Sequence, residues 1–100
     1  PAARELVARM QRRAFELTAD WEDVEEAELE PPALDRLAEI AVPTLVLLGD
    51  LDLDAIRVAA ERVASDVPGA RLVRWEGTAH LPSLERPEAF LELLEHHLRT

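Results

Sequence analysis

The chain has 100 residues, of which 48% are hydrophobic, a proportion that suits one small globular domain and exceeds that of disordered segments. Its 21 acidic and 11 basic residues give a formal net charge of −10, which argues against nucleic acid and anionic membranes as partners. It contains no cysteine, so disulfides and thiolate chemistry are excluded. The absence of cysteine is compatible with a reducing compartment, and no apolar run approaches the ~20 residues of a membrane span. We expect a cytoplasmic protein.

The first 30 residues are predicted to form a helix followed by an acidic connector. From Ala2 to Leu17, apolar side chains recur at helical spacing and form one stripe: Leu6, Met10, Ala14 and Leu17. The run Asp20–Glu30 carries seven acidic residues and little apolar material. We interpret this run as a solvated connector rather than a metal site.

A buried strand is predicted near the middle of the chain. Residues 31–100 form a second unit in this interpretation, and it opens with a short helical stretch at Leu34–Glu39. Val42–Leu48 is a nearly unbroken apolar run with β-forming residues, which is typical of a parallel strand covered on both faces. A strand of this composition is expected to have a neighbour on each side.

A helix and a second strand are predicted next. Asp54 is expected to cap the N-terminus of the helix, and Pro68 and Gly69 are expected to end it. Arg71–Trp75 is predicted to be an edge strand, because two arginines interrupt its apolar pattern. The order strand, helix, strand indicates a parallel pair with a right-handed crossover.

The chain is predicted to end in an amphipathic helix whose first turn contains Pro87. The unit is therefore α/β, but it contains only two parallel strands. Such a sheet has almost no core of its own, because parallel sheets are stable when both faces are covered. We expect the chain to be neither stable nor active by itself, and to use strands from another chain or from further sequence.

A carboxylate and an imidazole follow the two predicted strands. Asp52 lies just beyond the first strand, and His80 lies in the loop after the second. The carboxyl ends of parallel strands meet at one edge of a sheet, where open α/β sheets bind ligands. An aspartate and a histidine at this edge are two thirds of a Ser-His-Asp triad. Asp50 is interpreted as a turn residue and Asp54 as a cap, which leaves Asp52 as the candidate acid.

The same stretch resembles the C-terminal portion of the α/β-hydrolase family. The matching segments are I-x-V-P-T-L-V-L-L-G-x-x-D at Ile40–Asp52, V-P-G-A-R-L at Val67–Leu72, and G-T-A-H-L-P-S-L-E-R-P-E-A-F at Gly77–Phe90. The resemblance implies that the two strands are the last two of an eight-stranded sheet, and that residues 1–30 contain the end of a helical cap. It also implies that Asp52 is the triad acid and His80 the triad base.

The nucleophile of such a triad has no match in this sequence. The only serines are Ser65 and Ser83, and neither lies in a G-x-S-x-G nucleophile elbow. We therefore expect hydrolysis of an ester, lactone or amide bond of a small-molecule substrate, with the nucleophile on the N-terminal part of the same hydrolase. Two alternatives stay open: an aspartate nucleophile, as in dehalogenase and epoxide-hydrolase relatives, and a non-catalytic binding module of the same fold.

The remaining polar candidates are interpreted as structural. Glu85 lies in the matched segment after His80 and is predicted to hydrogen-bond loop backbone. His96 and His97 lie near a helix C-terminus, where positive charge favours the helix dipole. Trp75 is predicted to serve packing. No cofactor and no metal site are expected.

Overall fold

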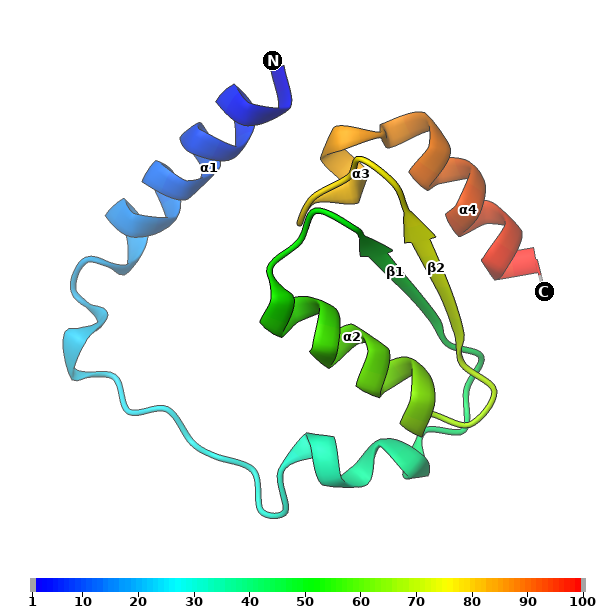
Figure 1. Cartoon of the computed structure of the whole chain (residues 1–100). Coiled ribbons are helices and arrows are strands. Elements are labelled where there is room, and N and C mark those ends of the chain that lie inside the picture. The colour runs from blue at the N-terminus through cyan, green and yellow to red at the C-terminus, as the bar shows by residue number, and fades with distance from the viewer. Residues whose placement is uncertain (1, 100) are drawn as a thin grey trace.

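The computed structural model describes residues 2–99 of the chain (Figure 1). The elements, in chain order, are α1 (Ala2–Thr18), the 3-10 helices η1 (Trp21–Asp23) and η2 (Ala33–Glu39), β1 (Leu45–Gly49), α2 (Asp54–Asp66), β2 (Arg71–Trp75), α3 (Pro82–Glu85) and α4 (Pro87–Arg99). Helices and a parallel sheet of two strands are thus combined within this range. No helix in the described range is long and apolar enough to cross a membrane.

The two strands pair in parallel and end at the same edge of the sheet. Leu45 is opposite Arg71 at one end of the pair, and Gly49 is opposite Trp75 at the other. The connection runs through α2, and Figure 1 shows α2 and α4 on opposite sides of the two strands. The parallel pairing predicted from the order of elements is confirmed. Whatever follows Gly49 and Trp75 in sequence is therefore brought to one place.

Strand β1 starts later than the sequence predicts. The prediction placed its start at Val42, but the first strand residue is Leu45, and the last is Gly49. Pro43 has no backbone N–H to donate to a sheet. The Val42 carbonyl accepts a hydrogen bond from the Thr44 hydroxyl over 2.9 Å, which is a local contact and not a strand pairing. The apolar pattern thus extends through a short turn before the strand.

The predicted helix cap at Asp54 is wrong. Helix α2 has Leu53 at its N-cap position, and no side chain caps it by a hydrogen bond. The Asp54 carboxylate pairs with Arg57 one turn further along. Asp54 still lies in the first turn, where a negative charge favours the helix dipole. A second difference is α3, because residues 82–85 were expected to belong to a loop and form one helical turn.

The chain leaves much of its apolar surface uncovered. Among the described residues, the buried hydrophobic side chains are those of Leu37, Leu48 and Val67. The accessible surface is 8166 Å², whereas a compact folded monomer of this mass has about 5,700 Å². The radius of gyration is 16.3 Å, against ~13 Å for a compact domain of this length. Part of the excess comes from α1 and the acidic connector, which lie apart from the α/β unit over most of their length (Figure 1).

Candidate functional site

The loops that follow β1 and β2 are joined by hydrogen bonds beyond the end of the sheet. The Asp50 N–H donates to the Trp75 carbonyl over 3.0 Å, and the Leu51 N–H donates to the Thr78 carbonyl over 2.9 Å. In the opposite direction, the Gly77 N–H donates to Oδ1 of Asp50 over 2.8 Å. The predicted turn residue Asp50 therefore also ties the two loops together.

Gly49 lets the second loop lie directly on the end of β1. A Cβ atom at this position would collide with the backbone carbonyl oxygens of Thr78 and Ala79. Thr78 is buried there, with 1% of its surface exposed, and its hydroxyl donates to the Glu76 carbonyl over 3.3 Å. The close approach of loop and strand thus depends on the missing side chain of a glycine.

Asp52 and His80 meet at this edge of the sheet. Oδ2 of Asp52 lies 2.8 Å from Nδ1 of His80, and Oδ1 accepts the Leu53 N–H over 2.8 Å. The Asp52 side chain is 6% exposed, whereas the His80 side chain is 65% exposed. The neighbouring Asp50 and Asp54 bind other groups, so the sequence correctly singled out Asp52 as the hydrogen-bond partner of His80. The catalytic roles of the pair remain a prediction.

The Asp52 carboxylate is held in its ionised form. Its hydrogen bond with His80 is the largest of the effects that lower the pKa of Asp52 below the ordinary value. Burial acts in the opposite direction, while the Leu53 N–H and the electrostatic interactions with His80 and Arg57 lower the pKa further. An ionised carboxylate can only accept hydrogen bonds, so Nδ1 of His80 must be the donor. In the neutral form of the imidazole, the proton is therefore on Nδ1 and the lone pair is on Nε2.

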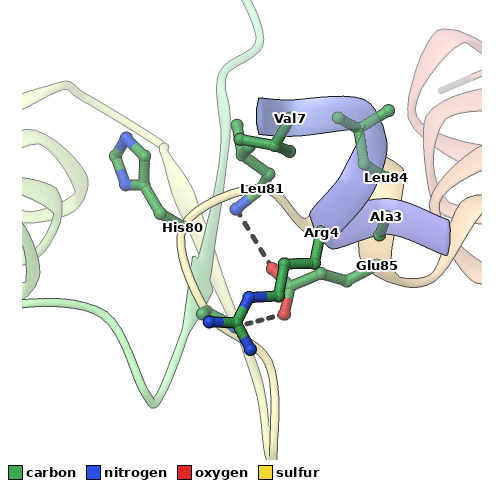
Figure 2. A pocket seen from close by; sticks show the side chains of 8 residues that line it. Ala3, Arg4, Val7, His80, Leu81, Leu84 and Glu85 are labelled. Atoms are coloured by element: carbon green, nitrogen blue, oxygen red, sulfur yellow. Dashed lines mark hydrogen bonds between the residues drawn. The ribbon is translucent and has the colours of Figure 1, made fainter. Parts of the chain in front are cut away.

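Glu85 accepts hydrogen bonds from the residues on both sides of His80. Oε1 accepts the Ala79 N–H over 2.9 Å, and Oε2 accepts the Leu81 N–H over 3.1 Å (Figure 2). This confirms the prediction that Glu85 binds loop backbone. The single turn of α3 carries Glu85 back toward the loop it supports.

A cavity of about 450 Å³ lies beside His80, between α1 and α3. Its lining is mostly apolar, and it consists of Ala3, Arg4, Val7, Ala79, His80, Leu81, Leu84 and Glu85. In Figure 2 the His80 ring lies to one side of the apolar side chains of Val7, Leu81 and Leu84. The contribution of α1 to this cavity was not foreseen. Its residues are more than 70 positions away from His80, and no local pattern marks them as neighbours.

The chain's two serines do not complete the pair. Ser65 lies on α2 and Ser83 on α3, and no hydrogen bond within residues 2–99 joins either hydroxyl to His80. His96 and His97 lie in the last turn of α4. Trp75 packs under the Arg86 guanidinium, which lies 4.8 Å from the centre of the indole ring. In the part of the chain that the structure describes, no group of three acidic or histidine side chains could hold a metal ion.

No protein-family model matches the chain. Among curated proteins, it is similar to a proline iminopeptidase of Saccharolobus solfataricus, with 30% identity over 64 residues. The match covers 64% of this chain and 20% of that protein, so the chain matches about a fifth of the length of this relative. The relative is a member of the α/β-hydrolase family, which agrees with the mixed helix and parallel-sheet arrangement and supports a function of the hydrolase type.

Proposed function

We propose that this chain is the C-terminal part of a serine-type α/β-fold hydrolase and supplies the triad acid and base. Asp52 is the acid, His80 is the base, and the nucleophile lies on an upstream segment. The observation that carries the proposal is the 2.8 Å hydrogen bond between a buried carboxylate and an exposed imidazole, at the carboxyl ends of adjacent parallel strands. The partial similarity to a proline iminopeptidase supports the hydrolase class.

The geometry suits general base catalysis. Nε2 of His80 takes the proton of the nucleophile as its oxygen attacks the substrate carbonyl, and then gives this proton to the leaving group. In the second half of the reaction the same nitrogen takes a proton from water, which attacks the covalent intermediate, and gives this proton to the oxygen of the nucleophile as the acyl group leaves as the acid product. Asp52 fixes the imidazole tautomer and stabilises the imidazolium that forms in both halves. The chain order, Asp before His, is that of the hydrolase fold.

The substrate proposed for this site is a small molecule with an ester, lactone or amide bond. The cavity beside His80 is large enough for a compact apolar group, since small-molecule pockets begin at roughly 300 Å³. Its apolar lining by Val7, Leu81 and Leu84 favours such a group next to the bond that breaks. The name of the relative adds proline amides to the substrates worth testing. This mechanism uses no cofactor.

The partner proposed for the chain is the N-terminal part of the same hydrolase. Strand β1 pairs only with β2 within the described residues, and parallel strands are normally found inside larger covered sheets. The chain exposes roughly 2,500 Å² more surface than a compact monomer of its mass. Part of this excess comes from α1 and the acidic connector, but large hydrophobic side chains are also exposed elsewhere in the chain, as is usual for the surface that an obligate partner covers. The additional strands would lie along the free edge of β1.

The test is to produce residues 1–100 together with the upstream segment and to measure hydrolysis of aryl esters, lactones and proline arylamides. His80→Ala is expected to lower kcat by several orders of magnitude. Asp52→Asn is expected to lower it by roughly 10⁴-fold, because the amide favours the wrong imidazole tautomer. A serine-directed fluorophosphonate should label the upstream segment in the same sample.

Asp54→Asn is the matched control, because Asp54 is an exposed carboxylate two residues from Asp52 that pairs with Arg57. It should keep wild-type kcat. Wild-type kcat in His80→Ala would refute the assignment of the base and favour a binding module. Loss of activity in His80→Ala without fluorophosphonate labelling of the wild type would instead favour an aspartate nucleophile.

A further inference from the structure

We propose that Glu85 is a positioning residue, whose carboxylate clamps the backbone around His80 and thereby sets the direction of the imidazole. The inference rests on the proposed function, because the direction of the ring matters for catalysis only if His80 is the base. Glu85 does not touch the reacting atoms in this proposal. It acts through the loop that carries the histidine.

The clamp holds two peptide groups with one carboxylate. One oxygen of Glu85 accepts the Ala79 N–H over 2.9 Å, and the other accepts the Leu81 N–H over 3.1 Å. These N–H groups belong to the peptide planes between residues 78 and 79 and between residues 80 and 81. Because both oxygens belong to one planar group, the carboxylate restrains the two peptide planes relative to each other.

The peptide plane between Ala79 and His80 is held from the other side. The Ala79 carbonyl lies directly over Gly49, at a position where a Cβ atom would collide with it. The Thr78 carbonyl next to it accepts the Leu51 N–H over 2.9 Å. Two of the three peptide planes around His80 are thus held by hydrogen bonds and the third is packed against Gly49, which restricts the backbone torsions of the histidine.

Backbone support matters here because side-chain packing on His80 is slight. The His80 side chain is 65% exposed, and its hydrogen bond to Asp52 is the one polar contact of the ring within the described residues. One hydrogen bond does not by itself fix both side-chain torsions of an exposed ring. The direction in which the ring leaves the loop is set by the Cα–Cβ bond, and this direction depends on the backbone that Glu85 holds.

A carboxylate is better suited to this position than any other side chain. Its two oxygens accept two N–H groups at once, and hydrogen bonds to an ionised acceptor are roughly twice as strong as neutral ones. Glu85 reaches back to the N–H of Leu81, the N-cap residue of α3; the acidic residue of a capping box makes the same bond from one position earlier in the helix. Glutamine offers one oxygen and one NH₂ group, so one backbone N–H would face another donor.

The test compares Glu85→Gln, Glu85→Asp and Glu92→Gln in the protein that contains both this chain and the nucleophile segment. Glu92 is the control, since it is an exposed glutamate on α4 whose side chain makes no hydrogen bond or ion pair among residues 2–99. For each variant we would measure the melting temperature, KM, kcat per titrated active site, and the low-field proton resonance of His80 Nδ1–H.

Glu85→Gln is expected to lower kcat by roughly 10²-fold, the cost of a misplacement of ~1 Å, while KM changes by less than about twofold. The His80 Nδ1–H resonance should shift or broaden. Glu85→Asp, which keeps two acceptors, should recover part of kcat. Glu92→Gln should match the wild type in all readouts.

Two results would overturn the clamp. One is a Glu85→Gln protein with wild-type kcat per active site and an unchanged His80 resonance, even if its melting temperature falls. The other is an equal loss of kcat in Glu92→Gln. If the wild-type protein hydrolyses no substrate, the proposed function fails while the clamp is still decided by the His80 resonance in Glu85→Gln. The two failures are therefore distinguishable.

Discussion

Replacement of Gly49 by alanine is expected to damage the site through a contact that involves no polar group of the triad. Gly49 is the last residue of β1. A Cβ atom there would lie less than 3.0 Å from two backbone oxygens, and at such a distance one of the atoms must shift. The atoms that it would meet are the backbone carbonyl oxygens of Thr78 and Ala79, which cannot rotate away as the end of a long side chain can. The whole loop that carries His80 must move.

The size of the effect follows from how the loop is held. The Thr78 carbonyl is bound by the Leu51 N–H, and the Ala79 N–H is bound by Glu85, so the clash cannot be relieved without straining these bonds. Overpacking of this kind costs about 1–3 kcal/mol of stability. If the loop lifts by ~1 Å, the misplaced imidazole should lower kcat by roughly 10²-fold.

Gly69→Ala is the matched control. Gly69 has φ of +71° in the turn before β2, and a Cβ atom there would meet no atom within 4 Å. The variant should therefore lose about 1–2 kcal/mol through backbone strain, and kcat should be kept. Urea denaturation and kcat per titrated active site, measured on the protein with its nucleophile segment, compare the two. Wild-type kcat in Gly49→Ala, or an equal loss of kcat in Gly69→Ala, would refute the argument.

Two further predictions concern the partner and the pH dependence. Residues 1–100 alone should have a radius of gyration well above ~13 Å by X-ray scattering and unfold without cooperativity, and a compact, cooperatively unfolding monomer would contradict the need for a partner. The pKa of Asp52 is lower in the folded protein than in the unfolded chain, where it is about 4. The ionised carboxylate therefore stabilises the folded protein at pH values above about 4, and this stabilisation is lost as the pH falls through the lower folded-state pKa. The difference in unfolding free energy between wild type and Asp52→Asn, measured by urea titration of the complete protein, should shrink in acid, and a difference that does not change with pH would argue against this linkage.

The sequence alone was sufficient for the local elements and for the hydrogen-bonded pair. The apolar periodicity of α1 and α4 and the edge-strand pattern of β2 each indicate one kind of element, and the structure has these elements there. Asp52 and His80 are 28 positions apart, yet the sequence predicts their contact. The reason is geometric, because two parallel strands joined by one helix place their carboxyl ends side by side.

The start of α2 and the start of β1 could not be predicted, because the sequence allows more than one local conformation at each of these places. Asp54 has the residue type of a helix cap, but Arg57 one turn away offers its carboxylate a charged partner, and the helix starts at Asp54 itself. Val42 has the composition of a strand residue, but Pro43 and the Thr44 hydroxyl turn the chain before pairing begins. In each case a contact with a nearby side chain or backbone group competes with a general propensity.

The sequence by itself determined which residues end the strands, and therefore that Asp52 and His80 would meet. Only the tertiary structure decided the details of how His80 is held: which two backbone N–H groups Glu85 accepts, and how closely the loop lies on the bare backbone of Gly49. It also decided that α1 would form a wall of the cavity beside His80. The approach of the loop to Gly49 and the position of α1 beside the cavity join segments that are distant in sequence and follow no helical or strand period, so these contacts form only once the chain has packed.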